Sequence, residues 1–365
     1  MKSEDRIRYP YSVDPVSTDG RGVDTGMGVL SGEASDQQAR RADRRLDQLA
    51  PEPWDQVPRG TGSNTTYYDV PMLKPSVWGI DIPIYYFLGG AAGAALTLGA
   101  GIQLVSKKND PDLRRLSAIC HWIGIIGSSG GAAFLVHDLG RPSRFLLMLR
   151  VFRPTSPMNV GAWILSGAAP TAIATGLFLN RDGFLGLVGE ICGYASGLFG
   201  AALATYTGVL VANTAIPVWQ ESRRWLPVLF AASGAATAGS VIDMVLDSGR
   251  GQSVGRMFGG AGRVAEIAAT LKIEGAASRV PRVGEPLRRG GPALLWRTAT
   301  ALTVASLTLS VVPGRSKEKR IAAGILGALG SLCMRFAVHY IANASARDPR
   351  ASFEQQRDRL GHARR

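Results

Sequence analysis

The chain has 365 residues, of which 46% are hydrophobic and only 19% are charged, and its formal net charge is +13. The apolar residues gather in long runs after residue 83, which excludes a soluble protein built from amphipathic helices. The arginines are scattered between these runs rather than aligned in one stripe. This distribution indicates a membrane protein near anionic lipid and argues against a nucleic-acid-binding protein.

The first 75 residues are polar and rich in Ser, Asp, Arg, Gly and Pro. They predict a disordered or largely extended tail, which is too polar to bury a core. Residues 1–80 hold no apolar stretch of the kind that a cleavable signal peptide requires, so we expect none. The aromatic and proline-rich stretch TYYDVPMLKPSVWG (66–79) is expected to lie along a partner or the membrane interface.

Eight apolar runs follow, each near the length that a helix needs to cross a hydrocarbon core of roughly 30 Å. Gly, Ala, Ser and Thr are frequent inside the runs, which is typical of membrane helices that approach one another closely. The sequence therefore predicts an all-α integral membrane protein. The predicted transmembrane helices cover 83–105, 116–136, 158–179, 184–212, 226–246, 254–271, 293–313 and 321–341.

Eight spans place both termini on one side of the membrane, here called the terminal side. Lys and Arg are somewhat more numerous on that side, so the positive-inside rule predicts cytoplasmic termini in a multi-pass protein of the inner (cytoplasmic) membrane. The cysteines Cys120, Cys192 and Cys333 stand singly in apolar runs, without any CxxC pair. We expect them to be packing residues, because such spacing suits neither a disulfide framework nor an iron–sulfur cluster.

The first four predicted helices all bring polar residues to the terminal side, which predicts a functional site there. An ionisable group at the end of a membrane helix is costly and by default indicates function. Simpler roles stay open, namely a helix cap for Asp81, interface aromatics for Trp78 and Tyr85, and a solvated pair for His137 and Asp138. The candidates are Trp78, Asp81, Tyr85 and Tyr86, then His137 and Asp138, then Asn159, and finally Tyr206.

The segment between the second and third predicted helices carries four arginines, Arg141, Arg144, Arg150 and Arg153. They are expected either to dock an acidic partner subunit or to hold this segment in the cytoplasm.

Three further ionisable residues, Asp243, Arg263 and Glu266, lie inside the fifth and sixth runs. Arg263 and Glu266 are three residues apart on one helix and can pair, and Asp243 is expected to face Arg263. The three predict a buried ion-pair network or a proton route.

A haem group would need two axial histidines at matching depth. His121 and His137 are about 24 Å apart along one predicted helix and cannot share a haem. His137 and His339 fall on the same side, so one haem is conceivable between them, but we expect none. No metal site is predicted.

Three stretches resemble the NrfD/PsrC family, the quinone-reactive membrane anchors of molybdoenzymes such as polysulfide reductase. They are YYFLGGAAGAAL (85–96), DLGRPSRFLLMLRVFRPTSPMNVGAWIL (138–165) and YTGVLVANTAIPVW (206–219), and the resemblance extends over about 76–345. It implies eight transmembrane helices in two four-helix bundles without haem. The first bundle, 76–220, would hold the quinone site and the second would cover 221–345, with polar tails at 1–75 and 346–365.

The resemblance also implies a respiratory role. Electrons would pass between a ferredoxin-like [4Fe–4S] partner and menaquinone or ubiquinone, and the iron–sulfur partner would join a molybdopterin or tungstopterin catalytic subunit. Formate is the substrate expected first, as in a formate dehydrogenase. Asp138, Arg141, Pro142, Asn159 and Tyr206 fall in the matching motifs, and Asp81 and His137 stand beside them. The residues expected to bind the quinone are His137, Tyr206, Asn159, Tyr85 and Trp78, with proton transfer by Asp138 and Asp81.

Two other functions remain open from the sequence. A proton-coupled secondary transporter would use Asp243, Arg263 and Glu266 among glycine-broken helices. A purely structural anchor would have no redox role.

Overall fold

The structure, a computed structural model, describes residues 23–24, 29–30, 71, 73–74, 76, 78–105, 110–141, 143–312 and 316–363. The chain divides into two compact units, Met1–Ser63 and Asn64–Arg365. In the first unit, strands β1 (Val23–Asp24) and β2 (Val29–Leu30) pair antiparallel, with Val23 opposite Leu30. Besides these strands, only residues 71 and 73–74 of the predicted extended tail (1–75) are described, and the rest lies outside the described residues.

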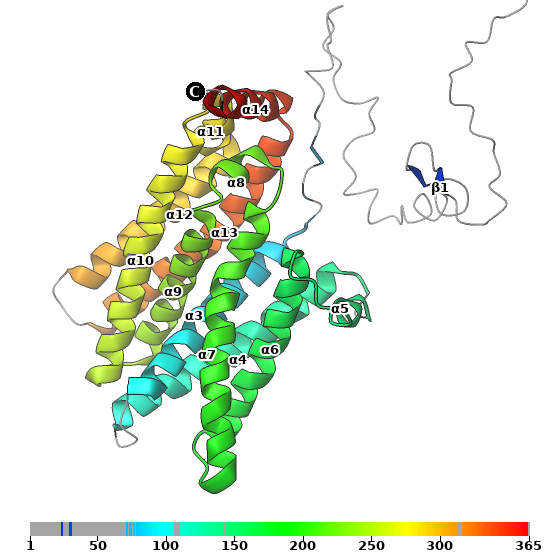
Figure 1. Cartoon of the computed structure of the whole chain (residues 1–365). Coiled ribbons are helices and arrows are strands. Elements are labelled where there is room, and N and C mark those ends of the chain that lie inside the picture. The colour runs from blue at the N-terminus through cyan, green and yellow to red at the C-terminus, as the bar shows by residue number, and fades with distance from the viewer. Residues whose placement is uncertain are drawn as a thin grey trace, which may run out of the picture. The chain divides into compact units, whose positions relative to one another are not determined.

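The second unit is helical throughout its described residues and contains eight long helices (Figure 1). Seven of these helices are long and apolar enough to cross a membrane. The predicted class, an all-α integral membrane protein, is therefore confirmed. The long helices are α3 (Asp81–Val105), α4 (Pro111–Asp138), α6 (Pro157–Phe178), α7 (Gly183–Ala212), α9 (Leu226–Val245), α10 (Gly249–Ala277), α12 (Gly290–Val311) and α13 (Lys317–Ala346).

Helix α10 coincides with the predicted span at 254–271 but is not among the seven apolar helices. It has 29 residues, so its length suffices to cross a bilayer. Its charges, including Arg256, Arg263 and Glu266, lower its apolar character. An eighth membrane-spanning helix therefore stays a prediction.

The long helices pack in two groups of four. In the first, α3 contacts α4 and α7, while α6 contacts both α4 and α7. In the second, α9 contacts α10 and α13, while α12 contacts both α10 and α13. Helix α3 also packs against α9 and α13, so it joins the two groups (Figure 1).

Glycines allow these helices to approach closely. A Cβ on Gly93 of α3 would lie 2.4 Å from the carbonyl oxygen of Gly200 on α7. A Cβ on Gly234 of α9 would likewise lie 2.4 Å from the carbonyl oxygen of Gly90 on α3. Any side chain at either position would force the backbones apart, which explains the glycine content of these runs.

Helix starts follow ordinary capping chemistry. Asp110 accepts hydrogen bonds from the backbone N–H groups of Asp112 and Leu113 at the start of α4, where Pro111 is the first helical residue. Ser156 caps α6 in the same way, followed by Pro157. Both helices thus begin where a polar acceptor satisfies otherwise unpaired N–H groups.

Four shorter helices lie on the terminal side (Figure 1). Three of them make contacts with one another beside the end of α13, and the Gln355 amide of α14 donates to the Pro217 carbonyl of α8 at 3.1 Å. The fourth, α5, contacts only the neighbouring α6 among the pairs with substantial contact in the described part of the chain. These helices are α5 (Ser143–Met148), α8 (Pro217–Glu221), α11 (Pro281–Arg288) and α14 (Pro349–Ala363).

On the opposite side, the start of α4 in the first group binds the start of α10 in the second. The backbone N–H of Arg250 donates to an Asp112 carboxylate oxygen at 2.9 Å, and the Arg250 guanidinium pairs with Asp110 at 2.9 Å. Gly249 precedes Arg250 with φ of +91°, a conformation that favours glycine. The first turn of a helix in one bundle therefore caps a helix of the other.

Candidate functional site

The terminal end of the first bundle holds a hydrogen bond between the side chains of two helices. Asp81 is the first residue of α3 and His137 lies in the last turn of α4. The Nδ1 atom of His137 lies 2.8 Å from the Oδ2 atom of Asp81, and the side chains are 67% and 27% exposed. The two residues predicted to reach the same side of the membrane are thus in direct contact at the edge of the protein.

Asp138 extends this group towards the interior. Its carboxylate accepts a hydrogen bond from the backbone of Gly79 and interacts electrostatically with Asp81 and His137. It also interacts with the hydroxyl group of Tyr86, one turn into α3. Two carboxylates and one imidazole therefore share this end of the bundle, which is a set of groups able to hold and exchange protons.

Two buried tyrosines follow Asp81 on α3, and one of them, Tyr86, interacts electrostatically with Asp138. Tyr85 and Tyr86 are each only 1% exposed, and their rings are 5.8 Å apart. Neither hydroxyl has a hydrogen-bond partner among the described residues. Buried hydroxyl groups are nearly always hydrogen-bonded in folded proteins, so both hydroxyls keep the capacity to donate a hydrogen bond to a ligand or water. Tyr86 is one of the polar residues predicted at this end, although only Tyr85 is among the residues predicted to bind the quinone.

Trp78 packs beside Tyr86 rather than outward. The two rings are 6.5 Å apart and nearly perpendicular, while Trp78 stacks on Trp219 of α8 at 6.1 Å. The Trp219 indole is fixed by a hydrogen bond to the Val338 carbonyl of α13. The predicted Trp78 therefore belongs to an aromatic group where the two bundles meet at the terminal end.

Tyr206 is buried in α7, as its position in the fourth run predicts. A Cβ on Gly161 of α6 would lie only 2.1 Å from the Tyr206 ring, so the glycine provides the space for this ring. Tyr206 thus lies between α6 and α7, and no contact with the His137–Asp81 pair is described for it.

Asn159 has a different environment from the other candidates. Its Oδ1 accepts from the Arg153 backbone at 2.7 Å, and its Nδ2 donates to the Met148 and Val151 carbonyls at 2.6 and 3.0 Å. Both amide hydrogens are therefore occupied by the α5–α6 connection. The arginines expected to dock a partner lie between α4 and α6, and two of them, Arg150 and Arg153, are in the α5–α6 connection. Arg141, Arg150 and Arg153 are exposed, and the Arg144 side chain lies outside the description.

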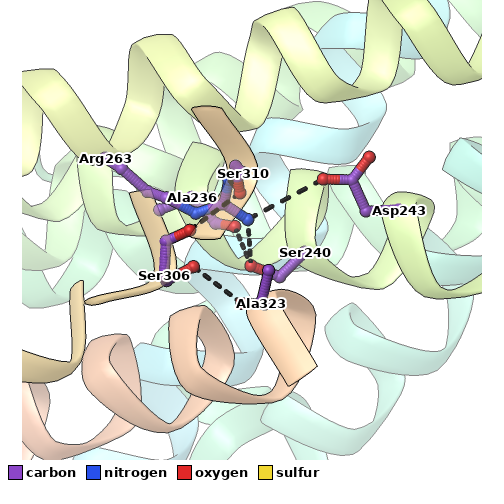
Figure 2. A network of polar contacts seen from close by, with 7 residues as sticks. All are labelled: Ala236, Ser240, Asp243, Arg263, Ser306, Ser310 and Ala323. Carbon is purple, nitrogen blue, oxygen red and sulfur yellow. Dashed lines mark hydrogen bonds and ion pairs between the residues drawn. The ribbon is translucent and has the colours of Figure 1, made fainter. Parts of the chain in front are cut away.

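The predicted charges of the second bundle form a buried network (Figure 2). The Arg263 guanidinium of α10 bonds Ser240 of α9 at 2.9 Å and Ser310 of α12 at 3.2 Å. It also lies 3.9 Å from the Asp243 carboxylate, and both side chains are almost fully buried. The expected approach of Asp243 to Arg263 is thus observed, and Asp243 rather than Glu266 is the described ion-pair partner.

Glu266 lies one turn along α10 and faces a second buried arginine. Its carboxylate accepts from the Ser331 hydroxyl at 3.4 Å and interacts electrostatically with Arg335 of α13. The Arg335 guanidinium bonds the Phe230 carbonyl at 2.8 Å and stacks over that ring at 4.0 Å. Sequence reasoning missed Arg335, although it is the only Lys, Arg, Asp or Glu residue in the run 321–341.

Arg335 also reaches the first bundle. A Cβ on Gly90 of α3 would lie 2.9 Å from the Arg335 Nη2 atom, and the guanidinium interacts electrostatically with Tyr86. The buried charges of the second bundle are therefore connected to the tyrosines behind the His137–Asp81 pair. Among the described residues, no group of three or more metal-binding side chains gathers here or elsewhere.

Comparison with known proteins identifies the family of this chain. A model of the family described as polysulphide reductase, NrfD, matches residues 69–249, about half of the chain. The matched stretch contains the whole first bundle, with Asp81, His137, Asp138 and both buried tyrosines. No curated protein matches the chain. The chain, an integral membrane protein with its polar groups gathered at one end of a four-helix bundle, belongs to the NrfD family.

Proposed function

We propose that this protein is the membrane subunit of a respiratory complex and exchanges electrons between an iron–sulfur partner and the quinone pool. The observation that carries the proposal is the pair of neighbouring buried hydroxyls on Tyr85 and Tyr86 without a partner among the described residues, of which Tyr86 interacts with Asp138 in the group of Asp81, His137 and Asp138. Membership of the NrfD family supports the same assignment.

The site has the groups that quinone chemistry requires. A quinone takes up two electrons and two protons to become a quinol, and its two carbonyl oxygens accept hydrogen bonds. Tyr86 and Tyr85 would donate hydrogen bonds from the protein interior, and Trp78 would cover one side of the ring space. His137, held by Asp81, and Asp138 would exchange the protons with water at the membrane surface.

Two residues implied by the resemblance take other places in this proposal. Tyr206 would line the space between α6 and α7, where an isoprenoid tail needs an apolar wall. Asn159 would support the site from outside, because its amide hydrogens already bond the α5–α6 connection. This division keeps the ring near α3 and α4.

The electrons require a second protein. We propose a ferredoxin-like [4Fe–4S] subunit on the terminal side, connected to a molybdopterin or tungstopterin enzyme. Formate is the first catalytic substrate to assay, and menaquinone and ubiquinone are both candidates for the lipid-soluble carrier. The complex would lie in the cytoplasmic membrane with the termini of this chain in the cytoplasm.

Binding of a fluorescent quinone analogue to the purified complex tests the site directly. Tyr86→Phe and His137→Ala should each weaken binding about tenfold, which corresponds to roughly 1.4 kcal/mol per hydrogen-bonding group. Tyr194→Phe, on the partly exposed surface of α7, is the matched control and should bind as the parent does. Unchanged binding in both site variants would refute the placement of the quinone.

The buried charges of the second bundle favour a structural role over transport. The negative charges of Asp243 and Glu266 are balanced by the positive charges of Arg263 and Arg335. All four side chains are at most 4% exposed. We propose an ion-pair network that fixes the packing of α9, α10 and α13, in place of a proton route. Proton-coupled uptake of a solute by vesicles containing this chain alone would favour the transporter instead.

A further inference from the structure

The connection between α4 and α6 has a surface that the proposed quinone site does not use. This connection, residues 139–156, is here called the α5 segment. It carries large apolar side chains that are mostly exposed: Leu146 at 67%, Leu147 at 63%, Phe152 at 58% and Val151 at 55%. A soluble surface rarely presents so many large apolar groups together, so the α5 segment requires a covering partner.

The apolar side chains continue a surface that faces lipid. Phe152 packs edge-on against Trp163 of α6, with the ring centroids 6.1 Å apart. Trp163, Ile173 and Leu177 lie exposed along the outer face of α6, one of the apolar helices that can cross a membrane. Because Trp163 is six residues into α6, Phe152 covers a position about 9 Å along the helix from its start.

The position of α5 agrees with this continuity. Figure 1 shows α5 projecting sideways from the bundle next to the first turn of α6, and α5 contacts α6. The segment is fixed in this place through the three hydrogen bonds of Asn159 to backbone atoms of 148, 151 and 153. The α5 segment therefore projects from the lateral surface of the bundle in a position that these hydrogen bonds fix.

The positive charge of the α5 segment favours lipids with negatively charged headgroups. It contains four arginines and no Asp or Glu, and Arg141, Arg150 and Arg153 are exposed. Arginines beside exposed Leu and Phe residues are typical of segments that lie in the plane of the headgroups. There the apolar side chains enter the acyl region while the guanidinium groups bind phosphates. Anionic phospholipids fit both properties.

We propose that the α5 segment is an interfacial anchor that binds anionic phospholipid headgroups at the terminal side of the first bundle. Its arginines then serve the membrane surface, and the iron–sulfur partner docks elsewhere on the terminal side. This inference is independent of the quinone site, because it concerns side chains outside that site.

Depth measurement with a nitroxide label tests the proposal on the full chain in phosphatidylglycerol nanodiscs. The label is placed at Leu147→Cys, after Cys192 and Cys333 are replaced by serine, and collision rates with oxygen and with a water-soluble nickel complex are compared. The aqueous control is Arg357→Cys on α14, and the lipid control is Leu294→Cys, exposed near the start of α12.

The label at 147 should behave as the one at 294, with an oxygen-to-nickel ratio severalfold higher than at 357. In phosphatidylcholine, or after Arg150→Gln with Arg153→Gln, the ratio should fall towards the aqueous value. A label at 147 that is open to nickel in the isolated chain and shielded only when the iron–sulfur subunit binds would overturn the proposal. That result would assign the segment to partner docking.

Discussion

The pair formed by Asp243 and Arg263 gives the sharpest test of how the second bundle is held together. Its charged atoms are 3.9 Å apart and both side chains are almost completely buried. At an effective dielectric constant of about 20, two unit charges at this distance attract by roughly 4 kcal/mol. Removal of one partner from such a pair leaves an uncompensated charge and costs about 3 to 5 kcal/mol.

We therefore expect Asp243→Asn and Arg263→Met each to lower the free energy of unfolding by about 3 kcal/mol or more. The double variant removes both charges, so its loss should be smaller than the sum of the two by about 2 to 3 kcal/mol. The residual loss comes from the hydrogen bonds of Arg263 to Ser240 and Ser310. Ser306→Ala, which removes a neutral bond to the Ala323 carbonyl, should cost only about 0.6 to 1.7 kcal/mol.

The measurement is reversible unfolding in mixed micelles of a mild detergent and dodecyl sulfate, followed by tryptophan fluorescence. Trp296 is buried on α12 in the same bundle and reports its unfolding. If the losses of the two single variants simply add in the double variant, the charges do not stabilise one another. The interpretation of the network as an ion pair would then be refuted.

Three other expectations follow from single contacts. Gly327→Ala should destabilise the fold by about 1 to 3 kcal/mol, because its Cβ would lie 2.4 Å from a buried serine hydroxyl. In the same thermal melts, Gly260→Ala, with nothing within 4 Å of the new Cβ, should be neutral or slightly stabilising. Asn159→Ala should speed tryptic cleavage of the α5 segment, whereas Asn213→Ala should leave that rate unchanged; equal rates would contradict the structural role of Asn159. Asp112→Ala should cost about 1 kcal/mol and raise hydrogen exchange at the first turn of α10, and unaltered exchange there would count against the cap.

The sequence predicted the fold class because long apolar runs have few alternative structures. Depth along each run also placed Asp81 and His137 on the same side, and the structure brings them into contact. Direction around the helix axis could not be obtained in that way, because these helices are apolar on all faces. For this reason the sequence placed both Tyr85 and Tyr86 at the terminal side but could not decide which of them faces the site, and the structure buries both.

Other differences arise from tertiary contacts. Nothing local to Asn159 distinguishes an amide that binds a ligand from one that binds a loop, and only the folded α5 segment supplies its partners. Arg335 was missed because one charge in an apolar run carries little weight until Glu266 and Phe230 are seen beside it. The charges of α10 are the reason that an eighth spanning helix stays a prediction rather than an observation.

The contact between Asp112 and the start of α10 has a consequence for biosynthesis. Residue 112 emerges from the ribosome before residue 250, so the acceptor is present before the donor is made. A helix start leaves its first N–H groups without internal partners, and here Asp112, in the first turn of α4, satisfies one of them. The start of α10 in the later half is thus capped by a residue that the earlier half already provides. Separate expression of the two halves would leave α10 without this cap, even though the family match ends at residue 249, one position before Arg250.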